Sequence, residues 1–139
     1  MTRNRASAKK AGTAFETQVA EYLAMKLADI RIERRAKTGA KDRGDIAGVM
    51  TVAGGHVVIE VKNHSRDNLP QWIKEAGVER QNDDDVTGAT VAGVVVHKRH
   101  GNGKAGEQYV SMTLETFVTL LEGGSPTRRF VDLAKEVGR

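Results

Sequence analysis

The sequence contains no cysteine among its 139 residues. This absence excludes a disulfide framework and a zinc site built from thiolates, and it is typical of proteins in a reducing interior. The longest apolar run, Val91 to Val96, is far too short to span a bilayer, and the basic start lacks the apolar stretch and cleavage site of a secretory signal. We therefore expect a soluble, cytoplasmic protein with no membrane partner.

The length and mass of the chain, 139 residues and 15.1 kDa, match those of one domain that buries its own core. The beginning of the chain is polar and basic, with Arg3, Arg5, Lys9 and Lys10 before the first aromatic residue, Phe15. We interpret residues 1–11 as a basic flexible tail and residues 12–139 as a single domain.

Positive charge exceeds negative charge, with 22 Lys and Arg against 18 Asp and Glu and a sequence pI near 9.5. Such a balance favours polyanionic partners. The excess lies in the amino-terminal residues and in "RIERRAKTGAKDR", residues 31–43. The alternative is that each basic run is simply solvated surface. For either run alone, this interpretation explains the charges as well as nucleic-acid contact does.

Hydrophobic periodicity predicts an α/β fold with a small central mixed sheet flanked by helices. Apolar spacings of three and four predict helices, whereas alternation or a continuous apolar run predicts strands. In chain order we expect a helix at 12–28, a strand at 31–35, a loop at 36–44, a hairpin of strands at 45–52 and 56–62, a helix at 68–85, a central strand within 90–100, a strand at 107–113, a helix at 114–121 and a last helix from Ser125. This order predicts a two-layer or three-layer sandwich.

Three charged side chains interrupt the hairpin, which otherwise has the pattern of buried strand. Asp45 begins its first strand, and Glu60 and Lys62 lie on one face of its second strand because side chains alternate. Two carboxylates brought together by the hairpin provide the oxygen ligands that Mg²⁺ prefers. A lysine beside them orients water and offsets charge on a reacting phosphate. The alternative is an exposed sheet edge with Glu60 and Lys62 on its solvent face.

Glu16 gives independent support for this site. It lies in register with Ala20, Leu23 and Leu27 at helical spacing, so it borders the packed stripe of the first helix. From there it can face the same site. A boundary glutamate paired with a neighbouring lysine or arginine explains the position equally well.

The stretches "GTAFETQVAEYL", "GDI" and "VVIEVKNH", with the basic loop between the first two, resemble the PD-(D/E)xK nuclease superfamily. The resemblance is greatest to its archaeal-type Holliday junction resolvases, which phages also encode, and by motif it covers Gly12 to Lys62. It implies a restriction-endonuclease-like αβββαβ core in which Glu16, Asp45, Glu60 and Lys62 are catalytic. It also implies that Asp45, Glu60 and Glu16 bind Mg²⁺, with Mn²⁺ expected to substitute.

The same resemblance assigns the basic loop to DNA contact near the scissile phosphate. The implied residues are Arg34, Arg35, Lys37, Lys41 and the loop's hydroxyl residue, Thr38. The chain departs from the pattern at Gly44, where the superfamily's name has proline. Lys98 and Arg99 are further candidate phosphate contacts because they follow the central strand, and ligands meet α/β sheets at strand ends.

These residues lead us to expect a Mg²⁺-dependent endonuclease that cuts branched DNA, in particular four-way junctions. We expect it to act as a homodimer. Its expected location is the cytoplasm, or the host cytoplasm if a phage encodes it. The first alternative is another structure-specific or repair nuclease of the superfamily. The second is a catalytically silent DNA-binding module of the same fold. The glycine-rich "GNGKAG", residues 101–106, is not a dinucleotide site, because a strand rather than a helix is predicted to follow it.

Overall fold

The computed structural model describes residues 4–37 and 39–127. Thr38 and most of the predicted last helix, residues 128–139, lie outside these residues. The elements along the chain are α1 (Arg5–Lys26), β1 (Glu33–Arg34), β2 (Ile46–Ala47), β3 (His56–Lys62), α2 (Leu69–Thr87), β4 (Thr90–His97), the 3₁₀ helix η1 (Ala105–Glu107), β5 (Tyr109–Ser111) and α3 (Leu114–Leu121). The α/β class and the order of elements match the sequence expectation.

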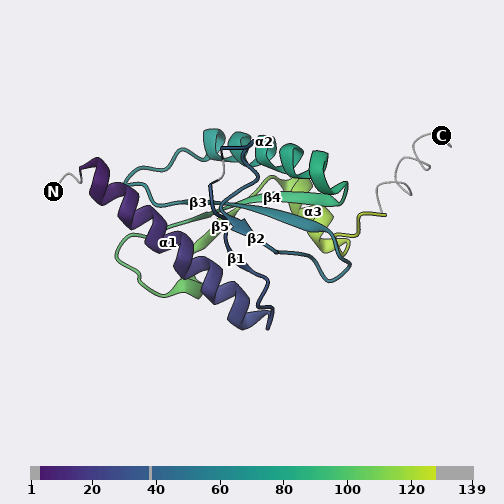
Figure 1. Cartoon of the computed structure of the whole chain (residues 1–139), viewed down its shortest axis with the longest axis horizontal. Coiled ribbons are helices and arrows are strands. Elements are labelled where there is room, and N and C mark those ends of the chain that lie inside the picture. Colours follow the sequence, from purple (N-terminus) through teal and green to yellow (C-terminus); the bar gives the residue numbers. More distant parts are fainter. Residues whose placement is uncertain (1–3, 38, 128–139) are drawn as a thin grey trace.

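The strands form one five-stranded sheet in the order β1-β2-β3-β4-β5 (Figure 1). β3 and β4 are parallel, and every other neighbouring pair is antiparallel. Parallel neighbours need a crossover connection, and α2 provides it. The sheet is therefore mixed, as predicted.

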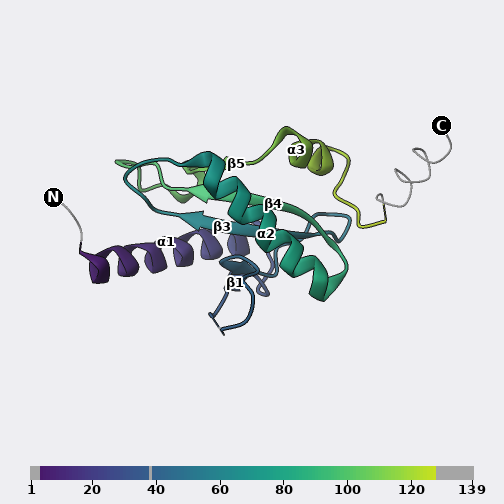
Figure 2. The same cartoon turned by 90° about the horizontal axis from the view of Figure 1, so that it is seen from above.

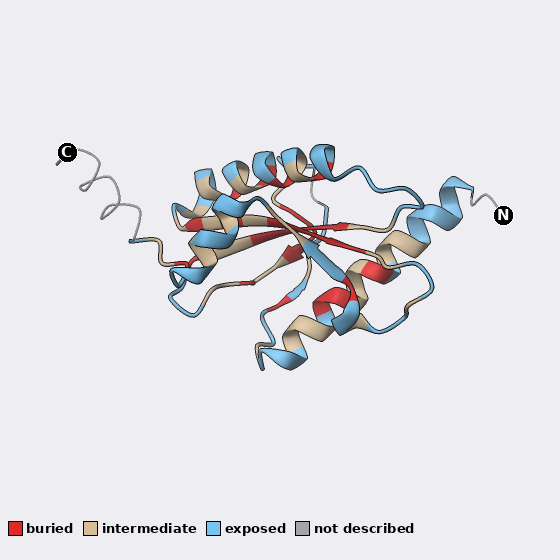
Figure 3. Cartoon of the chain, turned by 180° about the vertical axis from the view of Figure 1, so that it is seen from behind, coloured by how far each residue is buried: buried red, intermediate tan, exposed pale blue. Residues whose placement is uncertain are grey.

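Helices cover both faces of this sheet. α1 packs against β1 and β3 on one side, and α2 packs against β3 and β4 on the other (Figures 1 and 2). The shorter α3 packs against β4. The most deeply buried residues gather in the central strands and on the inner sides of α1 and α2 (Figure 3). The result is three layers with the catalytic candidates between them.

The helix α1 begins earlier than the apolar periodicity predicts. Asn4 caps it, since its side-chain oxygen accepts a hydrogen bond from the Ser7 N–H at 2.8 Å. Residues 5–11 are therefore helical rather than a flexible tail. Alanine, lysine and arginine dominate this stretch, and all three have high helix propensity even without a buried face.

The predicted first strand of the hairpin is shorter than expected, since β2 covers only Ile46–Ala47. Gly48 has a φ of +84°, and a side chain there would collide with the Arg31 carbonyl. The chain therefore bends at Gly48, and pairing resumes only as a single bridge between Met50 and His56. The bend leaves Asp45 at the end of a very short strand, directly beside β3.

The two layers of core differ in size. On the α1 side, Phe15 and Val19 join Ile59, Val61 and other residues in the larger cluster. On the α2 side, Trp72, Ala76 and Val95 form a small cluster. Apart from the buried Val58, the rest of the α2-facing side of β3 is polar, and it contains the candidate site. In the part of the chain that the structure describes, the helices are too short or too polar to cross a membrane.

Candidate active site

Asp45 is buried, with 2% of its surface exposed, and is held in one orientation. Its Oδ2 accepts a hydrogen bond from the Val61 N–H at 2.8 Å, and its Oδ1 lies 3.2 Å from Lys37 Nζ. Gly44 before it has a φ of +94°, and a Cβ there would lie 2.9 Å from the Ile59 carbonyl oxygen. Proline fixes φ at about −65°, so it could not adopt the positive φ that glycine adopts at this position.

Glu60 lies at the centre of a cluster of carboxyl groups. Burial raises the pKa of Glu60 well above its ordinary value, and the neighbouring carboxyl groups of Glu79 and Asp45 raise it further. Burial also raises the pKa of Glu79, in α2, and the negative charge of Asp42 acts in the same direction. Without a counter-ion, the cluster therefore retains protons that isolated carboxylic acids would release.

A divalent cation would satisfy this cluster. One oxygen atom from each of Asp42, Glu60 and Glu79 lies within 4.8 Å of the other two. The Oε2 atoms of Glu60 and Glu79 are buried and have no hydrogen-bond partner among the described residues. A hard ion such as Mg²⁺ prefers carboxylate oxygens and would take the place of the retained protons. The residues present therefore fit the predicted kind of metal.

The loop that carries Asp42 is fastened to α2. Arg43 Nη2 lies 2.7 Å from the buried Asp83 Oδ1, and Asn82 Nδ2 donates to the Asp42 carbonyl oxygen at 2.8 Å. Asp42 Oδ1 accepts from the Gly44 N–H at 2.9 Å. These contacts place an exposed loop carboxylate next to two buried ones.

Lys62 projects from β3 into the same region, as the alternation of side chains predicts. Its Nζ lies 2.7 Å from Glu75 Oε2 and 3.6 Å from Glu60 Oε1. Burial opposes the charge of Lys62, but the carboxylates of Glu75, Glu60 and Asp45 outweigh it and raise its pKa. Lys62 is therefore a cation in this site rather than a base.

Glu16 forms the ion pair with a neighbouring arginine that was one of the two interpretations of its sequence position. Its Oε2 pairs with Arg34 Nε at 2.8 Å. Burial raises the pKa of Glu16, and the charge of Asp45 contributes in the same direction. Glu16 thus borders the cluster from α1, on the side opposite Glu79.

The basic loop surrounds a hollow of about 420 Å³ that lies next to the carboxyl cluster. Its lining residues include Arg35, Lys37, Lys41 and Arg43.

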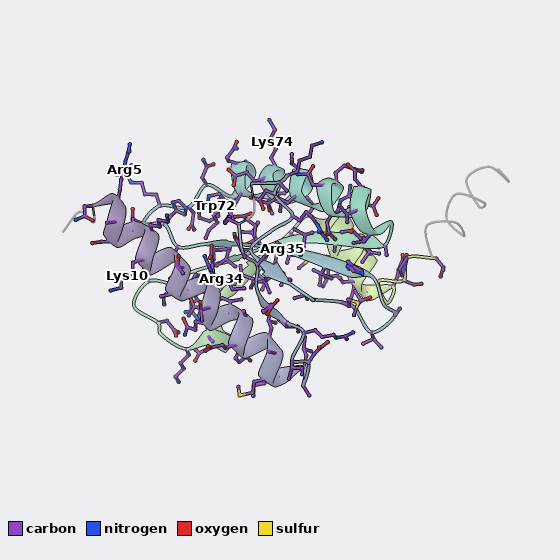
Figure 4. The ribbon with its side chains drawn as sticks, viewed as in Figure 1. Arg5, Lys10, Arg34, Arg35, Trp72 and Lys74 are labelled. Carbon is purple, nitrogen blue, oxygen red and sulfur yellow. The ribbon has the colours of Figure 1, made fainter. Side chains whose placement is uncertain are left out.

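Figure 4 shows Arg34 on the α1 side, whereas Arg35 lies closer to α2. Burial lowers the pKa of Arg35, and the charge of Arg43 beside it adds to that effect. Two of the predicted DNA-contacting side chains form ion pairs with carboxylates of the candidate site: Arg34 pairs with Glu16, and Lys37 pairs with Asp45.

At the end of β4, the structure treats the two predicted phosphate contacts differently. Lys98 Nζ donates to the carbonyl oxygens of Arg99 and Asn102, so its ammonium group is hydrogen-bonded within the loop that follows β4. Arg99 stacks on Tyr109, with its guanidinium carbon 4.6 Å from the ring centroid. Arg99 is therefore the better placed of the two to meet a ligand.

Sequence reasoning did not identify Asp42, Glu75 or Glu79. A usable signal existed for Glu79: Trp72, Ala76, Glu79 and Asp83 follow one another at spacings of four, three and four, and all four are buried. An apolar helical stripe that continues as acidic residues is the same signal that identified Glu16. Asp42 had no such signal, because it belongs to an irregular loop.

No family model, curated protein or solved structure matches this chain. The arrangement of carboxylates and basic side chains must therefore be interpreted from its own chemistry.

Proposed function

We propose that the protein is a Mg²⁺-dependent endonuclease that hydrolyses phosphodiester bonds in DNA, built on a restriction-endonuclease-like core of the PD-(D/E)xK type. The observation that carries the proposal is the pair of buried, unpartnered carboxylate oxygens of Glu60 and Glu79 beside Asp45, with the charged Lys62 next to them. Buried carboxylates without partners are costly, so their presence together favours a bound cation. The motif order from Glu16 to Lys62 supports the same class.

The chain's own residues divide the work of hydrolysis. The ion would be held by Asp45, Glu60 and Glu16, as the resemblance implies, or by Glu60 together with Asp42 and Glu79, whose oxygen atoms lie within 4.8 Å of one another. When bound there, Mg²⁺ polarises a phosphoryl oxygen and lowers the pKa of water. Lys62 remains protonated and offsets the negative charge that grows on the phosphate as water attacks phosphorus. The bond from phosphorus to the leaving sugar oxygen then breaks, the attacking water gives up a proton to solvent, and the leaving oxygen takes up a proton from solvent.

The ion pairs between loop and cluster fit a site that awaits both metal and DNA. Lys37 and Arg34 neutralise Asp45 and Glu16 in this structure. An ion would neutralise the carboxylates instead, leaving both basic side chains for phosphate oxygens. The hollow within the basic loop provides room for the strand beside the cluster.

The substrate class follows from the resemblance, and we propose branched DNA, in particular a four-way junction. Nicked, flapped or damaged duplex is the alternative within the same enzyme class. A catalytically silent DNA-binding module is the alternative from another class, and it is disfavoured because such a module gains nothing from buried carboxylates that lack partners.

We also propose a homodimer, because two symmetry-related sites can cut two of the strands that meet at a four-way junction. Large exposed apolar side chains on β5 and α3 support a protein partner on that side of the molecule: Val110, Leu114, Phe117, Val118 and Leu121. Phe117→Glu should convert dimer to monomer in sedimentation equilibrium, whereas Ile30→Glu, at an exposed position away from α3, should not. A parent protein that sediments as a monomer would refute the dimer.

The function is tested by incubating the purified protein with labelled four-way junction, fork, flap and linear duplex, in Mg²⁺ or in EDTA. We expect cleavage only with Mg²⁺ and fastest on the junction. Equal cutting of all substrates would favour the general nuclease, and binding without cutting in Mg²⁺ or Mn²⁺ would favour the silent module.

A further inference from the structure

A second hollow, of about 360 Å³, opens where β3 and β4 end. It is lined by residues of the segment after β3, of the end of β4 and the segment after it, and of β5: Ser65, Asp67, His97, Lys98, Arg99, His100 and Tyr109. Basic and hydrogen-bonding side chains predominate in this lining. Such a composition suits an oxyanion better than an apolar ligand.

One wall of this hollow is formed by the rings of His97 and Tyr109, which belong to a longer row of rings. Trp72 lies 5.7 Å from His64 on one side and 5.7 Å from His97 on the other, between ring centroids. His97 continues the row to Tyr109 at 6.0 Å, and its Nε2 lies 2.7 Å from Ser111 Oγ. The His97 ring is therefore held between Trp72 and Tyr109 and by Ser111.

Arg99 is held against this wall in a defined orientation. Its guanidinium stacks on Tyr109, and its Nη1 donates to the Glu107 carbonyl oxygen at 3.1 Å. A guanidinium has five N–H donors, so donors remain for a ligand. An arginine fixed by stacking loses little side-chain entropy when it binds an anion.

The amino terminus of α2 adds positive potential nearby. The helix begins at Leu69, close after Asp67, and its first turn contains no acidic residue. The Asn68 side chain makes no capping hydrogen bond to the described residues. The free N–H groups of a helix start favour anions.

The hollow lies next to the candidate active site, because residues of the two are paired on neighbouring strands. Lys62 is the direct partner of His97 in the parallel pairing of β3 and β4, and the Lys98 N–H donates to the Lys62 carbonyl oxygen at 2.9 Å. Neighbouring strands lie about 4.8 Å apart. A strand of nucleic acid that passes over Lys62 would therefore reach the hollow within one or two nucleotides, since consecutive phosphates advance about 3.4 Å along the helix axis.

We infer that this hollow is a phosphate subsite, in which Arg99 binds a backbone phosphate adjacent to the scissile one and thereby sets the position of the cut. The inference rests on the proposed function, because it assumes that the strand crosses Lys62. Asp67, the acid of the lining, opposes the anion and limits affinity.

Charge variants of the hollow test the subsite. Binding to a labelled four-way junction is measured in EDTA across a salt series, for the parent, Arg99→Gln, Asp67→Asn and the control Lys74→Gln, an exposed α2 residue that points away from the sheet (Figure 4). Removing the charge of Arg99 should weaken binding about tenfold and reduce the salt slope by about 0.9. Asp67→Asn should tighten binding, and the control should change little.

Mapping the cut sites in Mg²⁺ distinguishes phosphate binding by Arg99 from a purely structural role. If Arg99 only supported the fold, its loss would not change the position of the cut. With Arg99→Gln at saturating enzyme, cuts should spread over neighbouring phosphates instead of falling at the parent's position. Asp67→Asn keeps the test valid even if Arg99→Gln unfolds, because Asp67 is exposed.

The two proposals fail in distinguishable ways. If the parent binds and cuts DNA but Arg99→Gln and Asp67→Asn both behave like Lys74→Gln, the phosphate subsite is refuted and the nuclease stands. If the parent neither binds nor cuts any DNA substrate, both proposals are refuted.

Discussion

The two faces of β3 carry opposite kinds of chemistry on alternate residues of one strand. Ile59 and Val61 point toward α1 and belong to the larger apolar cluster. Glu60 and Lys62 point toward α2, where Glu75 and Glu79 meet them. Period-two alternation places both sets at nearly the same depth in the molecule.

This difference shows which face is built for stability and which for a ligand. The α1 face buries apolar side chains, which stabilises the fold without any partner. The α2 face buries carboxyl groups that repel one another, and this repulsion reduces stability until a cation or protons compensate. Fold and function are therefore separable by mutation along a single strand.

The largest effect is expected on the charged face. Asp45→Asn and Glu60→Gln each remove a ligand charge with little change of shape, so Mg²⁺-dependent cleavage should fall below detection while DNA binding stays nearly intact. Glu60→Gln should also leave the metal-free protein at least as stable as the parent, because repulsion is relieved. Single-turnover cleavage and thermal melting measure the two results.

The matched control for this pair is Glu21→Gln, at an exposed position of α1. It should cut at the parent rate. Undiminished cutting by both cluster variants would refute the catalytic assignment.

The opposite result is expected on the apolar face. Ile59→Ala should destabilise the protein by about 2–5 kcal/mol, because it leaves a cavity in the α1 core. At temperatures where the variant is folded, its cleavage rate should remain close to that of the parent. Urea unfolding followed by circular dichroism measures the destabilisation, and a change as small as that at an exposed position would contradict the division between faces.

Lys62→Ala should slow the chemical step by a factor of about 10² or more while leaving metal and DNA affinity in place. The reason is that its charge, maintained by Glu75 and Glu60, acts on the phosphate only as negative charge develops. Single-turnover rates at saturating enzyme isolate this step from binding. Lys74→Ala is the control. If Lys62→Ala cuts DNA as fast as Lys74→Ala, Lys62 has no role in the chemical step.

Neutralising Arg34, Arg35, Lys37 and Lys41 together should weaken DNA binding and flatten its salt dependence. The slope of log K against log salt should fall by about 0.9 for each phosphate that is no longer neutralised by the protein. Lys26→Gln, on an exposed turn at the end of α1, is the single-charge control. An unchanged slope would mean that the loop is solvated surface.

The last expected effect is a pH dependence of stability in the metal-free protein. Because the pKa of Glu60 is raised above its ordinary value of 4.5, the folded state retains a proton that the unfolded chain releases. Stability should therefore be greatest below that value and fall as pH rises toward the raised pKa, by at most about 1.4 kcal/mol per pH unit for one proton. Mg²⁺ should remove this decrease at neutral pH.

Urea unfolding at several pH values, with EDTA or Mg²⁺, measures this dependence. Glu60→Gln should show a weaker pH dependence than the parent. A parent protein whose stability rises with pH over the same interval would contradict the raised pKa.

Elements with a clear hydrophobic period were predictable from sequence, as were the neighbours that alternation dictates. The helices α1 and α2 and the strands β3 and β4 agree with their expected ranges to within a few residues, apart from the early start of α1. The adjacency of Asp45 and Glu60 followed from the hairpin, and the burial of Glu60 followed from the apolar residues around it in its strand.

What the sequence did not predict depends on tertiary contacts of irregular segments. The short β2 results from the approach of Gly48 to the Arg31 carbonyl, which no local pattern encodes. Asp42 joins the cluster because Arg43 and Asn82 fasten its loop to α2. Polar contacts between a loop and a helix have no periodicity, so neither could be anticipated.

The central claim, that the charged face of β3 holds a divalent cation, is tested most directly by titration calorimetry with Mg²⁺ at neutral pH in two buffers of different ionisation enthalpy. The parent should bind Mg²⁺ and release protons as it does so. Glu60→Gln and Glu79→Gln should each bind at least about tenfold more weakly and release fewer protons. A parent that binds no Mg²⁺, or variants that bind it as tightly with the same proton release, would contradict the account.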